Sequence, residues 1–151
     1  MDISWYISGF VDGEGCFSVS FNLRKKLKTG IEVRPSFSAS QHKRNLDVLK
    51  DIKKYFGVGG IRFSKRDNNY KYEVRSISDL TSVINPHFKK YPLRTTKAND
   101  FDTFNEICNL ISESKHLNSD YLAEIIEKAY QMNESGNRKY KKEYLLKLLA
   151  R

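Results

Sequence analysis

Two carboxylates end a short apolar segment near the start of the chain. Asp12 and Glu14 alternate there with Gly13 and Gly15. The apolar side chains before them recur at the spacing of one helix face, namely Ile3, Tyr6, Ile7 and Phe10. This spacing predicts a short buried helix over 3–13. Because the C-terminal end of a helix carries partial negative charge, acidic residues placed there are more readily explained by a bound cation. The plainer alternative is that this stretch only forms the turn that ends the helix.

The same segment carries a stripe of glycine. Gly9 and Gly13 are four residues apart, so they share one face of the predicted helix. Glycine lowers helix propensity, but it also removes the side chain that would keep a neighbouring helix at a distance. An apolar helix with such a stripe is suited to the close approach of a partner.

Strict alternation of apolar and polar residues predicts four strands in two hairpins. These strands cover 16–24, 32–40, 59–66 and 68–76. Pro35 lies on the inward side of the second strand and cannot donate a ladder hydrogen bond. We therefore expect that strand to be bulged or unpaired at Pro35.

Helical periodicity fills most of the remaining chain. It predicts helices over 44–56, 78–88, 97–112 and 119–132, then a polar break over 133–142 and a last short amphipathic helix. Gly57 should end the first of these helices, and Pro86 and Pro92 should close the second. The order of elements predicts an α+β domain in which two hairpins form one antiparallel sheet.

The outward faces of the four strands are rich in hydrogen-bonding side chains. They comprise Ser20, Asn22, Arg24, Glu32, Arg34, Ser36, Ser38, Ser40, Arg62, Ser64, Lys71, Glu73 and Arg75. Side chains of these kinds on a sheet can read the edges of bases in a nucleic-acid groove. An ordinary solvated sheet face would also be polar, so this pattern alone leaves both interpretations open.

Composition narrows the class of protein. The chain has 151 residues, the size of one domain, and 27 Lys and Arg against 18 Asp and Glu give a net charge of +9. A basic domain is drawn to polyanions, of which nucleic acid is the commonest. No run of about 18 apolar residues suggests a membrane span, and no targeting signal is evident at the N-terminus. Two cysteines and three scattered histidines make a disulfide framework or a zinc cluster improbable and favour a reducing compartment.

The stretch Ile7-Ser8-Gly9-Phe10-Val11-Asp12-Gly13-Glu14-Gly15 follows the LAGLIDADG pattern in its variant ending D-G-E-G. The chain thus resembles the LAGLIDADG homing endonucleases. The resemblance extends to the order of elements, to the glycine-rich residues 57–60 before the third strand, and to Tyr91-Pro92-Leu93 with Lys97 beyond. It covers about residues 3–110. It implies an α-ββ-α-ββ-α fold with a saddle-shaped sheet in a single domain over 1–151, with a C-terminal helical extension over about 112–151.

Because the chain has one copy of the motif, the resemblance implies a homodimer whose motif helices cross at a two-fold axis. The residues expected at this interface are Ser8, Gly9, Asp12 and Gly13. Glu14 and its symmetry mate would lie close together, and their repulsion would be relieved by divalent metal ions. Glu14 and the backbone carbonyl of Gly13 are the expected ligands of Mg²⁺, with Mn²⁺ able to substitute. Asp12 is expected to hold the helix end rather than to bind metal.

The resemblance implies further active-site residues. Gln41, at the end of the second strand, matches a position that orients the water network. Arg94 and Lys97 are both candidates for the basic residue at the phosphate, and the sequence does not choose between them. The outward strand residues given above would contact DNA, joined by the basic hairpin tip with Lys25, Lys26 and Lys28.

The implied activity is cleavage of both strands of double-stranded DNA at a long pseudo-palindromic site, by two-metal hydrolysis that leaves 3′ overhangs. Such enzymes are usually encoded within introns, so we expect an intracellular protein of an organelle or a microbe. The alternative is a non-cleaving nucleic-acid binder, such as an RNA maturase for intron splicing, and RNA is kept as a further partner. Retention of Glu14 favours the nuclease, because a pure binder has no need for a carboxylate near phosphates.

Overall fold

The computed structural model describes residues 1–132 and 138–151. Its first half alternates helices and hairpins, in the order α1 (Ile3–Glu14), β1 (Gly15–Leu23), β2 (Ile31–His42), α2 (Leu46–Phe56), β3 (Gly60–Ser64) and β4 (Asn69–Val74). The predicted α-ββ-α-ββ order is therefore confirmed. Gly57 ends α2 in the left-handed conformation, with a φ of 72° that a side chain would strain.

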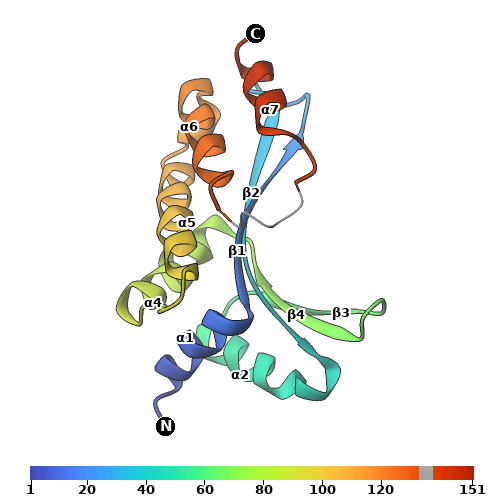
Figure 1. Cartoon of the computed structure of the whole chain (residues 1–151), viewed down its shortest axis with the longest axis vertical. Coiled ribbons are helices and arrows are strands. Elements are labelled where there is room, and N and C mark those ends of the chain that lie inside the picture. The colour runs from blue at the N-terminus through green and yellow to red at the C-terminus, as the bar shows by residue number, and fades with distance from the viewer. Residues whose placement is uncertain (133–137) are drawn as a thin grey trace.

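The four strands form one antiparallel sheet in the order β1-β2-β4-β3. Strand β2 holds the sheet together, since residues 31–39 pair with β1 and residues 37–42 pair with β4. Figure 1 shows β1 and β2 as a long vertical pair, from which the β3–β4 hairpin projects to one side.

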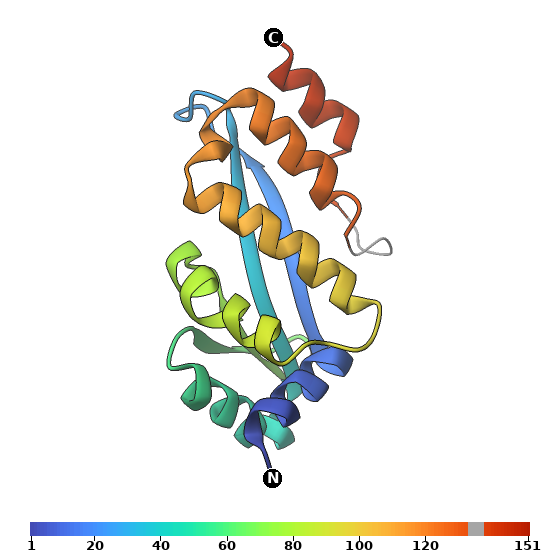
Figure 2. The same ribbon diagram turned by 90° about the vertical axis from the view of Figure 1, so that its left-hand side faces the viewer.

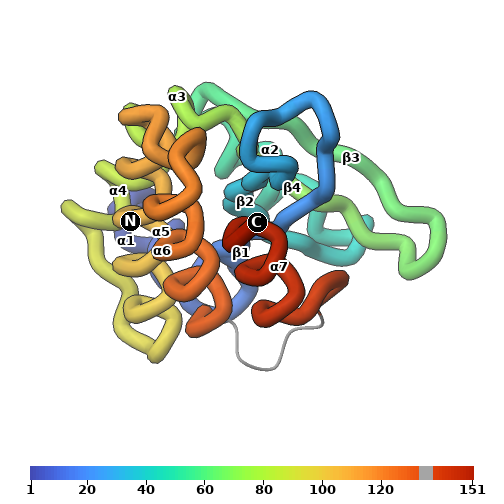
Figure 3. Tube along the Cα trace, turned by 90° about the horizontal axis from the view of Figure 1, so that it is seen from above, coloured from blue at the N-terminus to red at the C-terminus, as the bar shows by residue number. Residues whose placement is uncertain are grey.

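Helices of the second half cover the opposite side of the long strands. They are α3 (Ile77–Asp79), a π-helical turn (Leu80–Ile84), α4 (Asn85–Lys90), α5 (Lys97–Ser112), α6 (Ser119–Ala129) and α7 (Lys142–Leu149). Figures 2 and 3 show α4, α5 and α6 on the side of β1 and β2 away from the β3–β4 hairpin, with α7 above β1. Among the described residues, no helix has the length and apolar character needed to cross a membrane.

The predicted helix over 78–88 is longer than expected. The helical run continues from Ile77 to Lys90, so Pro86 does not close it. Pro86 stands in the first turn of α4, directly after the π-helical turn, where a missing backbone N–H is tolerated. The polar break predicted over 133–142 lies partly outside the described residues.

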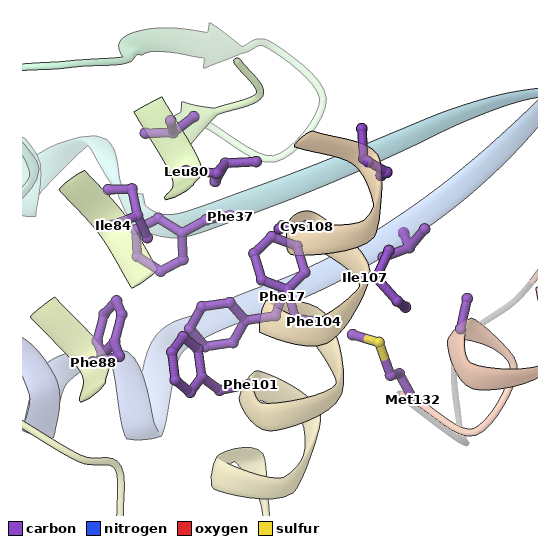
Figure 4. Close-up of a cluster of buried hydrophobic side chains, with 14 of the residues drawn as sticks. Phe17, Phe37, Leu80, Ile84, Phe88, Phe101, Phe104, Ile107, Cys108 and Met132 are labelled. Carbon is purple, nitrogen blue, oxygen red and sulfur yellow. The ribbon is translucent and has the colours of Figure 1, made fainter. Parts of the chain in front are cut away.

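The core is centred on the aromatic ring of Phe17 in β1. Its ring centroid lies 5.2 to 5.4 Å from those of Phe37, Phe88, Phe101 and Phe104. Figure 4 shows these rings gathered between the sheet and the helices. Rings at these separations and tilts add directional attraction to the burial of apolar surface. The same cluster of buried residues extends as far as Leu145 of α7.

The bulge expected at Pro35 is not observed. Pro35 pairs with Val19 in an unbroken register between β1 and β2. The carbonyl of Val19 accepts a hydrogen bond from the Arg138 side chain at the outer edge of β1, so it points away from β2. The backbone nitrogen of Pro35 must then point away from β1, and the β2–β4 pairing begins only at Phe37. The missing N–H therefore removes no ladder bond.

A chain of hydrogen bonds, partly buried and centred on His87, ties α1 to α2 and α4. Ser8 Oγ donates to the carbonyl oxygen of Tyr91 at 2.6 Å and lies 3.1 Å from His87 Nε2. Because the single hydroxyl proton of Ser8 is used, Nε2 must be the protonated nitrogen and must donate to Ser8. Nδ1 then accepts from the hydroxyl of Tyr55 at 3.0 Å, and Tyr55 accepts from Ser4 at 2.8 Å. Every member of the chain is satisfied while His87 is neutral.

This chain makes stability depend on pH. Burial lowers the pKa of His87 from 6.5 to about 4, whereas the unfolded chain takes up the proton near 6.5. The stabilising effect of neutral His87 is complete above pH 6.5 and is lost as the pH falls from 6.5 to 4. Between pH 7.5 and 5.0 we expect the free energy of unfolding to fall by about 2 kcal/mol from this residue. Urea denaturation at pH 7.5 and at pH 5.0 measures this fall in the free energy of unfolding. In His87→Asn the fall should be absent.

His42→Asn is the control, since His42 lies at the end of β2 outside this chain of hydrogen bonds. An equal pH dependence in wild type and His87→Asn would contradict the assignment.

Candidate functional site

Helix α1 passes directly into strand β1, with no connecting loop between Glu14 and Gly15. Asp2 begins the helix by accepting the backbone N–H of Ser4 at 2.9 Å, and Gly15 ends it in an extended conformation. A β-carbon at Gly15 would come within 2.5 Å of Val11 Cγ1 and 2.9 Å of the Val11 carbonyl oxygen. Only glycine therefore lets the helix pass directly into the strand, and Glu14 is held at this turn.

Asp12 joins the end of α1 to the loop before α5. Its carboxylate accepts the backbone N–H of Arg94 at 2.7 Å, and the N–H and hydroxyl of Thr95 at 3.1 and 2.6 Å. Burial raises the pKa of Asp12, but hydrogen bonds from Thr95 and Arg94 and the charge of Lys97 outweigh it and leave the pKa lowered. The ionised Asp12 thus has the expected role of holding the helix end, through contacts within its own chain.

Lys97 occupies the same helix end. Its ammonium group donates to the carbonyl oxygens of Val11 at 2.9 Å and Gly15 at 2.5 Å. A cation at the C-terminal end of a helix is electrostatically favourable, so this contact also stabilises α1. Arg94, the other basic candidate, contributes its backbone N–H to Asp12, and its side chain has no hydrogen bond or ion pair with the described residues. The structure therefore brings Lys97, rather than the Arg94 side chain, to the end of the motif.

Glu14 is exposed, and its carboxylate makes no hydrogen bond or ion pair with any residue that the structure describes. Because α1 ends at Glu14, the Gly13 carbonyl has no helical partner four residues on. One free carboxylate and one free carbonyl are the hard oxygen donors that Mg²⁺ prefers, so the donor set fits this ion. Within residues 1–132 and 138–151, no three His, Cys, Asp or Glu side chains come together to hold a metal.

Gln41 lies close to this junction by strand register. Ala39 pairs with Gly15, and β2 continues beyond this pair, carrying Gln41 past the point where α1 ends. The Gln41 Oε1 accepts from Asn45 Nδ2 at 3.0 Å, so its side-chain amide keeps its N–H groups for other partners. The predicted water-orienting role stays a prediction.

The outer face of α1 is apolar and uncovered, contrary to the predicted buried face. Ser4, Ile7, Ser8 and Val11 are the buried residues of α1. Ile3 and Tyr6, expected inside, are 39% and 40% exposed. The structure does not support the assignment of Ser8 to the interface with a partner helix. Ser8 is buried against Tyr91 and His87 of its own chain.

Gly9 and Gly13 lie on the exposed face of α1. A β-carbon built at either position meets no atom within 4 Å. Nothing within the described part of the chain therefore requires glycine at these two positions, although glycine weakens the helix.

The polar face of the sheet brings the predicted outward residues together. The register pairs Ser20 with Arg34, Asn22 with Glu32 and Arg62 with Lys71. Ser38, at 8% exposure, is the one that is nearly covered. Cys16 was missed by the sequence analysis, although it alternates with Phe17 on the same strand and pairs with Ser38. Burial raises the pKa of its thiol, against the charges of Lys97 and Lys71.

Comparisons with known proteins agree with this geometry. The profile of the LAGLIDADG endonuclease family matches residues 7–108. A probable intron-encoded endonuclease 3 of Neurospora crassa is 33% identical over 130 residues, which are 85% of this chain. The chain spans only 24% of the length of that relative.

Two solved structures share the fold. The homing endonuclease I-TnaI superposes with a TM-score of 0.84 at 36% identity, over 97% of this chain and 95% of that one. I-SmaMI, bound to an uncleaved DNA target in the presence of calcium ions, gives a TM-score of 0.85 at 32% identity, over 97% of this chain and 47% of that one. With the family profile covering most of its length, the chain belongs to the LAGLIDADG endonuclease family.

Proposed function

We propose that the chain acts as a homodimeric, site-specific endonuclease that hydrolyses both strands of double-stranded DNA. The observation that carries this proposal is the exposed Glu14 carboxylate, held without a partner at the rigid end of α1. Lys97 lies at the same helix end, and the polar face of the sheet begins at the adjacent strand. The partnerless carboxylate also favours cleavage over a maturase that only binds RNA, because a carboxylate near phosphates weakens plain binding.

The relatives support a DNA substrate and an intron origin. Several are named intron-encoded or homing endonucleases, and one structural neighbour is bound to DNA. Since the chain spans a minor part of the first relatives, their whole activity comes to this chain as part of the proposal. We expect a long pseudo-palindromic target, cleavage that leaves 3′ overhangs, and a gene within an intron of an organelle or a microbe.

Two copies would meet through the exposed face of α1. Gly9 and Gly13 have open space above them, flanked by the exposed rings of Trp5 and Tyr6. A second α1 helix could approach closely over the glycines while the flanking rings lose contact with water. I-SmaMI, of which this chain covers 47%, has room for a second unit of this size within one chain. The dimer would bring two Glu14 carboxylates and two Gly13 carbonyls to one place.

The residues at this place have distinct roles. Glu14 and the Gly13 carbonyl would hold Mg²⁺, or Mn²⁺ in its place. When bound, the metal supplies activation of water and stabilisation of the leaving oxygen. Lys97 offers its ammonium to the charge that develops on the phosphate, and Gln41 offers its amide N–H groups to orient water. Asp12 fixes the loop directly before Lys97 and so holds Lys97 near Glu14.

Replacing Glu14 with Gln should abolish cleavage while binding persists. Gln keeps the shape of the side chain but removes the charge that holds a divalent ion, and we expect the cleavage rate to fall at least about 1000-fold. Cleavage of a randomised two-fold-symmetric duplex library in Mg²⁺ measures this loss. Glu113→Gln, an exposed glutamate beyond α5, is the matched control. Selective binding without cleavage by the wild type in Mg²⁺ and Mn²⁺ would overturn the nuclease assignment.

Replacing Gly9 with Ala should have opposite effects on the monomer and on the dimer. In the monomer the added methyl group meets open space, and helix propensity improves by about 1 kcal/mol. In the dimer the methyl group would push the facing helix away. Sedimentation over a range of protein concentrations should show a weakened dimer, whereas Gly60→Ala, an equally open glycine in β3, should not. An unchanged dimer in Gly9→Ala would exclude this face as the interface.

A further inference from the structure

The cations on the polar face of the sheet and at its β1–β2 turn fall into two groups, those paired with a glutamate and those without a partner among the described residues. The cations on or beside the strands are Arg24, Arg34, Arg62, Lys71 and Arg75, and each lies within 4 Å of a glutamate oxygen. The lysines of the β1–β2 turn are Lys25, Lys26 and Lys28, and none has a hydrogen bond or ion pair with the described residues. Within the part of the chain that the structure describes, two carboxylates, those of Glu32 and Glu73, hold all five strand cations.

Glu73 collects groups from three strands. Its Oε1 lies 3.1 Å from Arg75 Nε and 3.6 Å from Arg62 Nη2. Its Oε2 lies 3.5 Å from Lys71 Nζ and accepts the hydroxyl of Ser36 at 3.0 Å. The glutamate side chain is only 14% exposed, whereas that of Arg62 is 64% exposed. The carboxylate thus sits low on the sheet and the cations reach up from it towards solvent.

The sheet register makes room for this arrangement. Glu73 of β4 pairs with Gly60 of β3, which has no side chain to cover it. A hollow of about 180 Å³ lies there, lined by Gly60, Ile61, Arg62, Lys71 and Glu73.

Glu32 repeats the arrangement at the far end of the long strands. Its carboxylate contacts Arg24 Nη1 at 2.5 Å and the Nε of Arg34. Glu32 and Arg34 are two residues apart on β2, so they share the polar face, and Arg24 follows Asn22, the partner of Glu32 on β1.

The cations of these pairs are 38% to 64% exposed, and ion pairs with such exposed partners contribute little to folding stability. Both glutamates are ionised at neutral pH. Hydrogen bonds from Arg24 lower the pKa of Glu32, and for Glu73 the Ser36 hydroxyl and the cations outweigh the effect of burial. Each carboxylate lowers the attraction of its neighbours for phosphate and also fixes their direction. A guanidinium reads guanine only when its fork is aligned with the base edge, whereas phosphate requires little beyond charge.

We infer that Glu32 and Glu73 are positioning residues for base recognition, which hold the strand cations in fixed directions and restrain their binding to phosphate. The turn lysines Lys25, Lys26 and Lys28 then provide the sequence-independent contact with the DNA backbone. This inference rests on the proposed function, since it assigns roles on the surface that would meet DNA.

Glu73→Gln tests the inference. Gln keeps the size of the side chain and an oxygen for the Ser36 hydroxyl, but it releases the cations. Glu106→Gln is the matched control, because Glu106 of α5 pairs with Lys128 at 2.9 Å away from the sheet and loses the same charge. The target is first selected from a randomised duplex library with the wild type. Affinity is then measured for that duplex, for its single-base-pair variants and for a random duplex, at several salt concentrations.

We expect Glu73→Gln to bind the random duplex about tenfold more tightly, with a steeper salt dependence, because more cations are free for phosphate. Its discrimination between the selected duplex and the variants under the β3–β4 hairpin should fall about tenfold. Glu106→Gln should change neither quantity. Glu32→Gln, in a separate cluster, should lose discrimination at different base pairs, so that a folding defect in one variant does not decide the result.

Three outcomes would overturn the inference. Equal tightening in Glu106→Gln would assign the effect to net charge, and unchanged discrimination in both sheet variants would show that the glutamates position nothing. If the wild type still cleaves the selected duplex in either case, the proposed function stands and only this inference falls. Absence of any duplex binding by the wild type would remove the proposed function and the inference together.

Discussion

The arrangement of this protein depends on how the C-terminal end of α1 is fixed. A helix that passes directly into a strand leaves its last carbonyls open. Here the Lys97 ammonium donates to the carbonyls of Val11 and Gly15, and the Asp12 carboxylate accepts hydrogen bonds from the loop before α5. Asp12 binds the backbone of Thr95, two residues before Lys97, so the same loop carries both contacts. The position of Glu14 relative to the sheet follows from these bonds and from the absence of a side chain at Gly15. The site is therefore built on a helix end and a strand start rather than on a loop.

Much of the fold could be predicted from local patterns. Alternation over Phe17, Val19 and Phe21 gave the strands, because one side of the sheet is buried and the other is not. The prediction of a bulge at Pro35 was wrong. The cost of the missing N–H depends on which strand the proline nitrogen faces, and this is known only from the assembled sheet. Pro86 was misjudged for a related reason, since the π-helical turn before it could not be read from periodicity.

The candidate site was predictable in its residue types and less so in their directions. The nonapeptide pointed to Asp12, Gly13 and Glu14. The apolar pattern of α1 placed Ile7 correctly in the core but wrongly placed Ile3 and Tyr6 there. Ser4 and Ser8 are buried because Tyr55, His87 and Tyr91 accept or donate their hydrogen bonds from more than 50 residues away. The choice between Arg94 and Lys97 likewise required the fold, because only the orientation of α5 shows which of them turns towards α1. Sequence spacing carries no information on such long-range partners.

The outer edge of β1 has a consequence for how copies of the chain can associate. An exposed edge strand offers a row of free N–H and C=O groups to another strand, and such edges are routes to unwanted aggregation. Here the Arg138 side chain donates hydrogen bonds to the carbonyl of Val19, in the middle of this edge, and to the carbonyl of Ala129. Its guanidinium also stacks on the ring of Tyr130. Arg138 thus hinders strand-to-strand pairing at this point of β1. Arg138, far from the motif, therefore makes this edge less available to a second strand, whereas the face of α1 that carries Gly9 and Gly13 stays open.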